Sequence, residues 1–104
     1  MRGLTVCAVQ YMDTVVAKLI ISGGVPIVQL NSGGYRSVTT KGRINDFLMN
    51  MQREHGLSLG RVWQDDWMWY YYLPYGPWHK RKDFYDGMMI RPDFLESNTE
   101  AVYH

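Results

Sequence analysis

Two apolar runs separated by a pair of glycines constrain the fold of this chain most strongly. Val15–Ile21 and Val25–Leu30 are rich in β-branched residues, and Gly23-Gly24 lies between them. Because glycine tolerates the positive φ angles of a two-residue type I′ turn, this pattern predicts a β-hairpin. A second break, Asn31–Gly34, leads into Tyr35–Val38, which we expect to form a third strand. The segment therefore predicts a three-stranded antiparallel meander.

The apolar spacing then changes to that of a helix. Four apolar residues form an i, i+3, i+4, i+7 stripe: Ile44, Phe47, Leu48 and Met51. This spacing predicts an amphipathic helix from about Thr40 to His55, with polar residues on its other faces. Thr39 or Thr40 is a suitable N-cap, and Gly56 suits the left-handed position that ends many helices. The helix therefore has one apolar face to bury.

A cluster of aromatic residues dominates the next part of the chain. Eight aromatic residues lie between positions 63 and 78: Trp63, Trp67, Trp69, Tyr70, Tyr71, Tyr72, Tyr75 and Trp78. The period of two across Arg61–Leu73 predicts a long strand, which Asp65-Asp66 interrupts as a bulge or an early turn. Pro74–Asp83, with two prolines and a basic run, predicts a loop, and Phe84–Ile90 predicts a final strand.

These elements predict an α+β fold. We expect an antiparallel sheet of about five strands, formed by the meander and a long hairpin, packed on the one amphipathic helix. The single domain should cover residues 15–92, with residues 1–14 as an N-terminal extension and residues 93–104 as a C-terminal tail. A chain of 104 residues is long enough to bury one hydrophobic core without help.

Composition excludes several classes of function. The formal net charge is +1, so no strong overall field attracts nucleic acid, a membrane or an acidic substrate. The single cysteine, Cys7, can form neither an internal disulfide nor a cysteine-based zinc site, which suits a reducing cytoplasm. No stretch approaches the roughly 18 apolar residues of a membrane span. We therefore expect an intracellular protein without a membrane partner.

The glycine pairs do not form a nucleotide-binding motif. A P-loop needs a lysine followed by serine or threonine directly after its glycines, at the start of a helix. Here a predicted strand follows Gly34, and Thr39-Thr40-Lys41 reverses the order of lysine and hydroxyl. We therefore interpret both pairs as turns, with an anion site at the helix N-terminus as the less favoured alternative.

The titratable residues do not assemble a catalytic centre either. His55, His79 and His104 lack the spacing of metal ligands, so we expect no metal and no cofactor. Cys7 has no recognisable base near it in the sequence. Four carboxylates can converge across the predicted hairpin as in hydrolases or metal-dependent nucleases, although solvated charges are the commoner explanation. These carboxylates are Asp65, Asp66, Asp83 and Asp86.

The aromatic strand and the basic loop after it predict a binding surface. One helix covers only one face of a sheet, so one aromatic face of the strand should stay partly exposed. Rings beside cations are typical of protein interfaces and of single-stranded nucleic-acid sites. A solvated hairpin tip and a tail folded over the aromatic face are the alternatives. The candidate binding residues are Trp67, Trp69, Tyr71, Trp78, Lys80, Arg81 and Lys82.

Three stretches resemble a group of small proteins from tailed bacteriophages and prophages. They are KLIISGGVPIVQLNSGGYRSVTTKGRIN (Lys18–Asn45), QDDWMWYY (Gln64–Tyr71) and FYDGMMI (Phe84–Ile90). The resemblance spans Lys18 to Ile90 and implies a phage origin, hence the cytoplasm of an infected bacterial host, but no particular activity. Small non-enzymatic phage proteins commonly bind host nucleases, CRISPR complexes or the transcription and replication machinery.

The leading hypothesis is a non-enzymatic phage accessory protein that binds and modulates or inhibits a host protein. Anti-defence proteins, such as anti-CRISPR inhibitors, act in this way. One alternative is a small module that binds single-stranded nucleic acid with the same rings. The second alternative is a metal-dependent hydrolase or nuclease that uses the four carboxylates. A homodimer formed through the exposed face also stays open.

The apolar stripe generates a first prediction. Phe47→Asp should unfold the domain, because it removes a buried aromatic ring worth about 1.5 to 3 kcal/mol and places a charge in the core. Circular dichroism should show no cooperative melting for this variant. Asn50→Asp, on the polar side of the same helix, should melt like the wild type. A Phe47→Asp protein that melts at the wild-type temperature would contradict the prediction.

Overall fold

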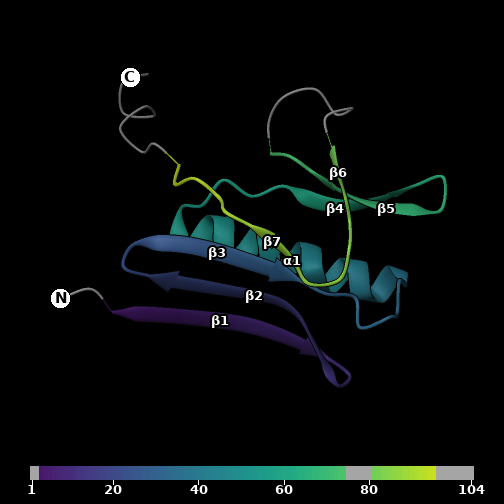
Figure 1. Ribbon diagram of the computed structural model, residues 1–104, viewed down its shortest axis with the longest axis horizontal. Helices are drawn as coiled ribbons and strands as arrows, with labels where there is room; N and C mark the ends of the chain where they lie inside the picture. The colour runs from purple at the N-terminus through teal and green to yellow at the C-terminus, as the bar shows by residue number, and fades with distance from the viewer. Residues whose placement is uncertain (1–2, 75–80, 96–104) are drawn as a thin grey trace.

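The computed structural model describes residues 3–74 and 81–95. This part of the chain contains one helix and seven strands in two antiparallel sheets, so the α+β prediction is confirmed (Figure 1). The strand orders are β1-β2-β3-β7 and β4-β5-β6, where we expected a single sheet. The bounds are β1 Leu4–Tyr11, β2 Thr14–Ser22, β3 Val25–Leu30, α1 Val38–His55, β4 Arg61–Asp65, β5 Met68–Tyr72, β6 Arg81–Asp83 and β7 Met88–Ile90.

The hairpin predicted around the first glycine pair forms the centre of the larger sheet. Ser22 pairs with Val25, so the loop between β2 and β3 has two residues. Gly23 and Gly24 have φ angles of 59° and 81°, both in the left-handed region that a type I′ turn requires. Glycine occupies these positions without the steric cost that a Cβ atom would bring.

The second glycine pair leads into the helix and not into a third strand. Gly33 and Gly34 also turn the chain, but the prediction of a strand over Tyr35–Val38 is wrong. Ser37 is the N-cap of α1, because its side chain accepts a hydrogen bond from the backbone N–H of Thr40 at 3.2 Å. This bond satisfies a donor that the first helical turn leaves free. The cap therefore lies before Thr39 and Thr40, the two residues we expected to supply it.

Helix α1 otherwise follows the sequence pattern. All four residues of the predicted stripe are buried, and Gly56 ends the helix with a φ of 65°. Figure 1 shows α1 running across one face of the larger sheet. Within the part of the chain that the structure describes, no helix is long and apolar enough to span a membrane.

Strand β1 lies in a segment that we expected to be an extension of the domain. It pairs with β2 along its whole length, from Leu4 opposite Ser22 to Tyr11 opposite Thr14, so the described sheet begins at Leu4 and not at Val15. Alternate β1 residues are half-buried against the core, among them Cys7. The intervening positions are also largely apolar, so the segment lacks the alternation that marks a strand in the sequence.

The predicted long aromatic strand is a hairpin. β4 and β5 are joined by Asp66-Trp67, so the interruption at Asp65-Asp66 is an early turn, one of the two forms we expected. β6 lies within the segment predicted as a loop and pairs with β5. The chain then turns at Gly87, with a φ of 86°, and only Met88–Ile90 of the predicted final strand pairs with β3.

The predicted tail begins beside the end of the helix. Leu57 and Phe94 form an isolated antiparallel bridge, supported by a hydrogen bond from the backbone N–H of Ser58 to the carbonyl of Asp93 at 2.7 Å. Residues 96–104 lie outside the described part of the chain. The alternative in which the tail folds over the aromatic face therefore depends mainly on residues outside the described part of the chain.

One core joins the helix to both sheets. Its buried residues include Leu19 and Leu30 from the larger sheet and Val62 from the smaller one. Asn45 of α1 fixes the smaller sheet by a pair of hydrogen bonds to one residue of β4. Its amide donates to the carbonyl of Val62 at 2.9 Å, and its side-chain oxygen accepts from the N–H of Val62 at 2.7 Å. A side chain thus satisfies backbone groups on an edge strand, where another strand would otherwise pair.

This bridge generates a second prediction. Asn45→Ala should lower the free energy of unfolding by about 1 to 3 kcal/mol, because it leaves a donor and an acceptor of Val62 without partners. Urea unfolding followed by circular dichroism measures the difference. Asn50→Ala is the matched control, since within the described residues the Asn50 side chain hydrogen bonds only to the exposed side chain of Arg53. Equal stability of the two variants would show that the bridge contributes nothing.

Candidate functional site

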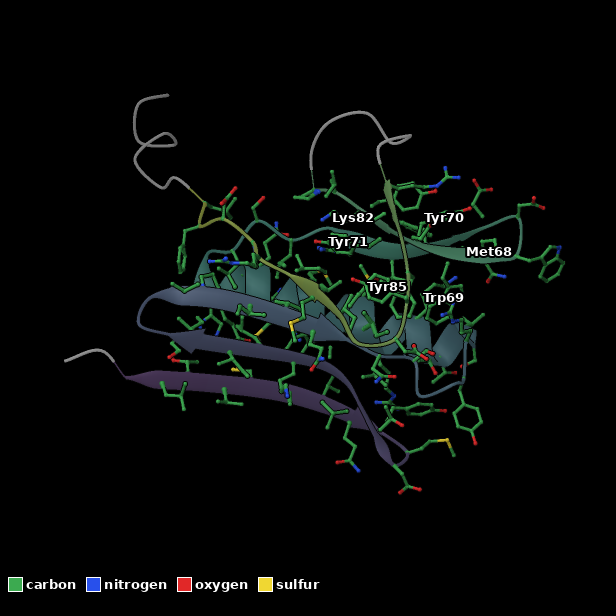
Figure 2. The ribbon with its side chains drawn as sticks, in the orientation of Figure 1. Met68, Trp69, Tyr70, Tyr71, Lys82 and Tyr85 are labelled. Atoms are coloured by element: carbon green, nitrogen blue, oxygen red, sulfur yellow. The ribbon has the colours of Figure 1, made fainter. Side chains whose placement is uncertain are left out.

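The two faces of β5 have opposite environments. Trp69 and Tyr71 are buried, with 2% and 1% of their surfaces exposed, whereas Tyr70 and Tyr72 are half-buried on the other face. Figure 2 shows Trp69 on the side of β5 that faces the rest of the domain and Tyr70 on the side that faces away. The expectation that one aromatic face stays partly exposed agrees with this structure. The exposed face is not the one that contains Trp69 and Tyr71.

Trp69 and Tyr71 are held in the core by specific contacts. The Trp69 ring meets Phe84 edge to face at 5.2 Å, and the Arg36 guanidinium lies 5.7 Å from the Trp69 ring centre. The Tyr71 hydroxyl accepts a hydrogen bond from the N–H of Gly60 at 2.7 Å. Burial raises the pKa of Tyr71 above its ordinary value of 10.0, and the bond to Gly60 opposes that rise. These contacts keep both rings away from any partner.

The outer face of the smaller sheet carries a group of rings around one arginine. Trp63 of β4 pairs with Tyr70, and Tyr72 pairs with Arg81 of β6. The Arg81 guanidinium lies 3.9 Å from the ring centre of Tyr70 and 5.8 Å from that of Tyr72. It also contacts the Asp65 carboxylate at 3.7 Å. We call Trp63, Tyr70, Tyr72 and Arg81 the aromatic face.

The charges around the aromatic face balance. Register places Arg61 opposite Tyr72, and Asp83 opposite Tyr70, so both side chains lie on the outer face. With Arg81 and Asp65, the residues of this face that the structure describes include two cations and two anions. A surface of this composition has no net field to attract a polyanion.

The tip of the β4–β5 hairpin extends this surface. Trp67 is 86% exposed and has a φ of 67°, and its neighbour Asp66 has a φ of 50°. Aspartate tolerates the left-handed region, but for a bulky residue this conformation is strained. The turn thus presents a large apolar ring to solvent at a position where glycine would be the more stable residue.

The predicted site residues therefore separate into five groups. Trp67 lies at the hairpin tip and Arg81 on the aromatic face. Lys82 is exposed opposite Tyr71, and thus on the other face of the sheet. Trp69 and Tyr71 are in the core. The remaining two predicted residues, Trp78 and Lys80, fall in residues 75–80, which the structure does not describe.

Trp63, Tyr70 and Tyr72 are not among the predicted site residues because of the turn at Asp66-Trp67. In one continuous strand, Trp63 and Trp69 would point the same way, since their numbers differ by six. A two-residue turn instead pairs Trp63 with Tyr70, so Trp63 shares a face with the even-numbered residues of β5. The position of the turn at Asp66-Trp67 therefore decides which rings share a face with Trp63.

The four candidate carboxylates do not act as one group. Asp65 contacts Arg81, whereas Asp86 accepts hydrogen bonds from the N–H and the hydroxyl of Ser32 at 2.8 and 2.7 Å. Asp86 thereby fixes the turn that precedes the helix. Among residues 3–74 and 81–95, no group of three His, Cys, Asp or Glu side chains is placed to hold a metal ion.

Cys7 has a neighbour that the sequence could not reveal. Its Sγ lies 3.8 Å from Nε2 of His55, and Cys7 also lines a pocket of about 290 Å³ between β1 and α1. An imidazole beside a thiol can accept its proton. Within the described residues, no carboxylate or amide hydrogen bonds to His55, as the third member of a catalytic triad would.

Comparison with known proteins agrees with the phage resemblance. The Kyanoviridae Gp96 protein family matches residues 2–91 of this chain. The chain belongs to this family. The Gp96 family is a cyanophage family, and its match covers both sheets and α1, including β1 near the N-terminus. No curated protein and no solved structure matches the chain.

The burial of Tyr71 generates a third prediction. Tyr71→Phe should lower the free energy of unfolding at pH 7 by about 1 to 3 kcal/mol, because the N–H of Gly60 loses its acceptor. Above pH 10 the unfolded tyrosine ionises while the folded one, with its raised pKa, resists ionisation. Wild-type stability therefore falls as pH rises above 10, and the gap between wild type and Tyr71→Phe narrows.

Urea unfolding at pH 7 and at several pH values above 10 measures this gap. Tyr70→Phe, on the outer face, is the control for loss of a tyrosine hydroxyl and should have nearly wild-type stability at pH 7. A gap for Tyr71→Phe that stays constant or widens above pH 10 would be inconsistent with the raised pKa.

Proposed function

We propose that this member of the Gp96 family is a non-enzymatic accessory protein that binds and modulates a host protein. The contact surface is the aromatic face together with Trp67 at the hairpin tip. The observation that carries the proposal is a group of exposed tryptophans, half-buried tyrosines and one arginine, the three residue types most enriched at interface hot spots. Inhibition of a host defence complex, as anti-CRISPR proteins achieve, is the specific form of modulation that we favour.

The order already present in the aromatic face supports binding. Arg81 is held between Tyr70 and Tyr72 and contacts Asp65 before any partner arrives. Association normally costs about 0.5 to 1.5 kcal/mol for each flexible side chain that becomes immobilised. An arginine that is already held against rings loses less freedom on binding, so more of its contact energy contributes to affinity.

The strain at Trp67 supports the same surface. A left-handed backbone costs a residue with a Cβ atom about 1 to 2 kcal/mol. Burial within the chain does not offset this cost, because 86% of the Trp67 surface is exposed. Backbone strain concentrates at functional sites, and a partner that buries the indole would supply the missing compensation.

The charge balance favours a protein partner over nucleic acid. Proteins that bind single strands combine stacking rings with a positively charged groove. Here the rings are present, but Asp65 and Asp83 on the outer face offset Arg61 and Arg81. Two carboxylates beside the rings would repel the phosphates of a bound strand, whereas balanced charges are common around protein interfaces.

A fourth prediction tests this surface by affinity capture. The tagged full chain is incubated with lysates of several hosts at several growth stages, and captured proteins are quantified by mass spectrometry. We expect one host protein to be enriched, and its affinity for the purified chain is then measured. Trp63→Ala and Trp67→Gly should each weaken binding about thirtyfold, the effect of a hot-spot loss of about 2 kcal/mol.

The controls separate binding from folding. Trp67→Gly relieves the turn, so it should melt no lower than the wild type while binding less. Tyr35→Ala removes an aromatic side chain that is 62% exposed, close to the 56% of Trp63, but lies outside both sheets and should bind normally. No enriched partner in any lysate, or a partner equally bound by Trp63→Ala and Trp67→Gly, would refute the proposal.

Nucleic acid is tested in parallel. Fluorescence anisotropy with labelled single-stranded DNA and RNA at two salt concentrations should show no binding. Affinity that falls steeply with salt, and that Trp63→Ala abolishes, would instead favour the nucleic-acid alternative, since phosphate contacts release counterions.

A further inference from the structure

Strand β1 is a long sheet edge with unpaired backbone groups. It ends the order β1-β2-β3-β7, and among the described residues no other strand pairs with its outer side. Figure 1 shows it as the lowest strand of the larger sheet. Eight residues of β-strand present an edge about 27 Å long, at about 3.4 Å per residue. Such an edge is a ready template for another strand.

The other sheet edges of the described chain are protected. On β4, the Asn45 side chain pairs with both backbone groups of Val62. β6 has only three residues, and all of them are charged. β7 also has only three residues. Short length, charge and covering groups are the usual means by which proteins prevent pairing between edges.

β1 has none of these protections. Its sequence, LTVCAVQY, contains no charged residue and no proline, and the register shift in its pairing with β2 leaves all eight residues in the ladder. Leu4 and Val6 on the face away from α1 are exposed, Val6 by 55%. Among the described strands, β1 is therefore the edge most open to pairing with another strand.

A second copy of this chain fits the edge. We propose that two copies pair through antiparallel β1 strands about a two-fold axis, which joins their larger sheets into one eight-stranded sheet. When the axis passes through a residue of β1, each residue meets one from the same face of the sheet. Exposed Leu4, Val6 and Ala8 then continue the open face, while Cys7 and Val9 continue the face covered by α1.

Charge favours this occupant. Self-pairing about a two-fold axis brings the residues near the axis close to their own copies, so a charged residue near the middle of β1 would lie close to a like charge. Because β1 has no charge, the second copy meets no such repulsion. The interface consists mainly of one strand ladder and is smaller than a standard protein interface, so we expect a dimer in the micromolar range. The aromatic face lies on the other sheet, so this proposal stands or fails independently of the proposed function.

Sedimentation velocity of the full chain, over a wide concentration range and with a reductant to prevent Cys7 disulfides, measures the dimer. Val6→Lys places like charges close together across the new ladder and should raise the dimer dissociation constant about tenfold or more. Met89→Lys is the matched control, because Met89 lies on the same open face, is 61% exposed and belongs to β7. It should dimerise like the wild type.

Hydrogen exchange identifies the strand directly. Amides of residues 4–11 should become more protected as concentration rises, while those of β6 should not change. Three results would overturn the proposal: a monomer at all concentrations, a dimer that Val6→Lys leaves intact, or β1 exchange that does not depend on concentration. A dimer that Trp63→Ala dissociates would also overturn it, since that result would assign self-association to the aromatic face. Thermal melting confirms that each variant is folded.

Discussion

Burial of the Trp69 and Tyr71 rings joins the three-stranded sheet to the rest of the domain. Trp69 packs against Phe84, and the Tyr71 hydroxyl accepts a hydrogen bond from the N–H of Gly60. Two contacts on the buried face of β5 therefore fix this strand. Asn45 adds a polar connection from α1 to β4. Because β5 alternates strictly, burying one set of rings forces the other set outward. The exposed aromatic face is therefore a consequence of how the second sheet is anchored.

One helix and two sheets leave more apolar surface than the domain can cover. α1 packs against the larger sheet and also contacts β4, and all three contribute to a single core. Two of the uncovered regions are chemically different. One is a set of rings around Arg81 with balanced charges among the described residues, which we propose as the contact surface for a host protein. The other is the uncharged edge of β1, which suits a copy of itself. Membership of a phage family is compatible with a small protein that acts by contact.

Local patterns were reliable where local energetics decide the structure. The stripe from Ile44 to Met51 and the turn at Gly23-Gly24 depend on helix periodicity and on the φ preference of glycine, which short windows of sequence contain. The prediction of a third strand over Tyr35–Val38 is wrong because Ser37 caps the helix at this point. A capping side chain can outweigh the strand preference of a short run. β1 was not predicted as a strand because both of its faces are largely apolar, so its sequence shows little alternation of apolar and polar residues.

The sequence by itself determined the α+β class, the amphipathic helix, the central hairpin and the presence of a surplus of aromatic rings. Only the tertiary structure decided which rings are exposed. The two-residue turn at Asp66-Trp67 reverses the relation between Trp63 and Trp69, and the core then selects one face for burial. Contacts such as that of Cys7 with His55 likewise join residues 48 positions apart. Periodicity fixes which residues share a face, but the choice of the buried face depends on long-range packing, which no local window contains.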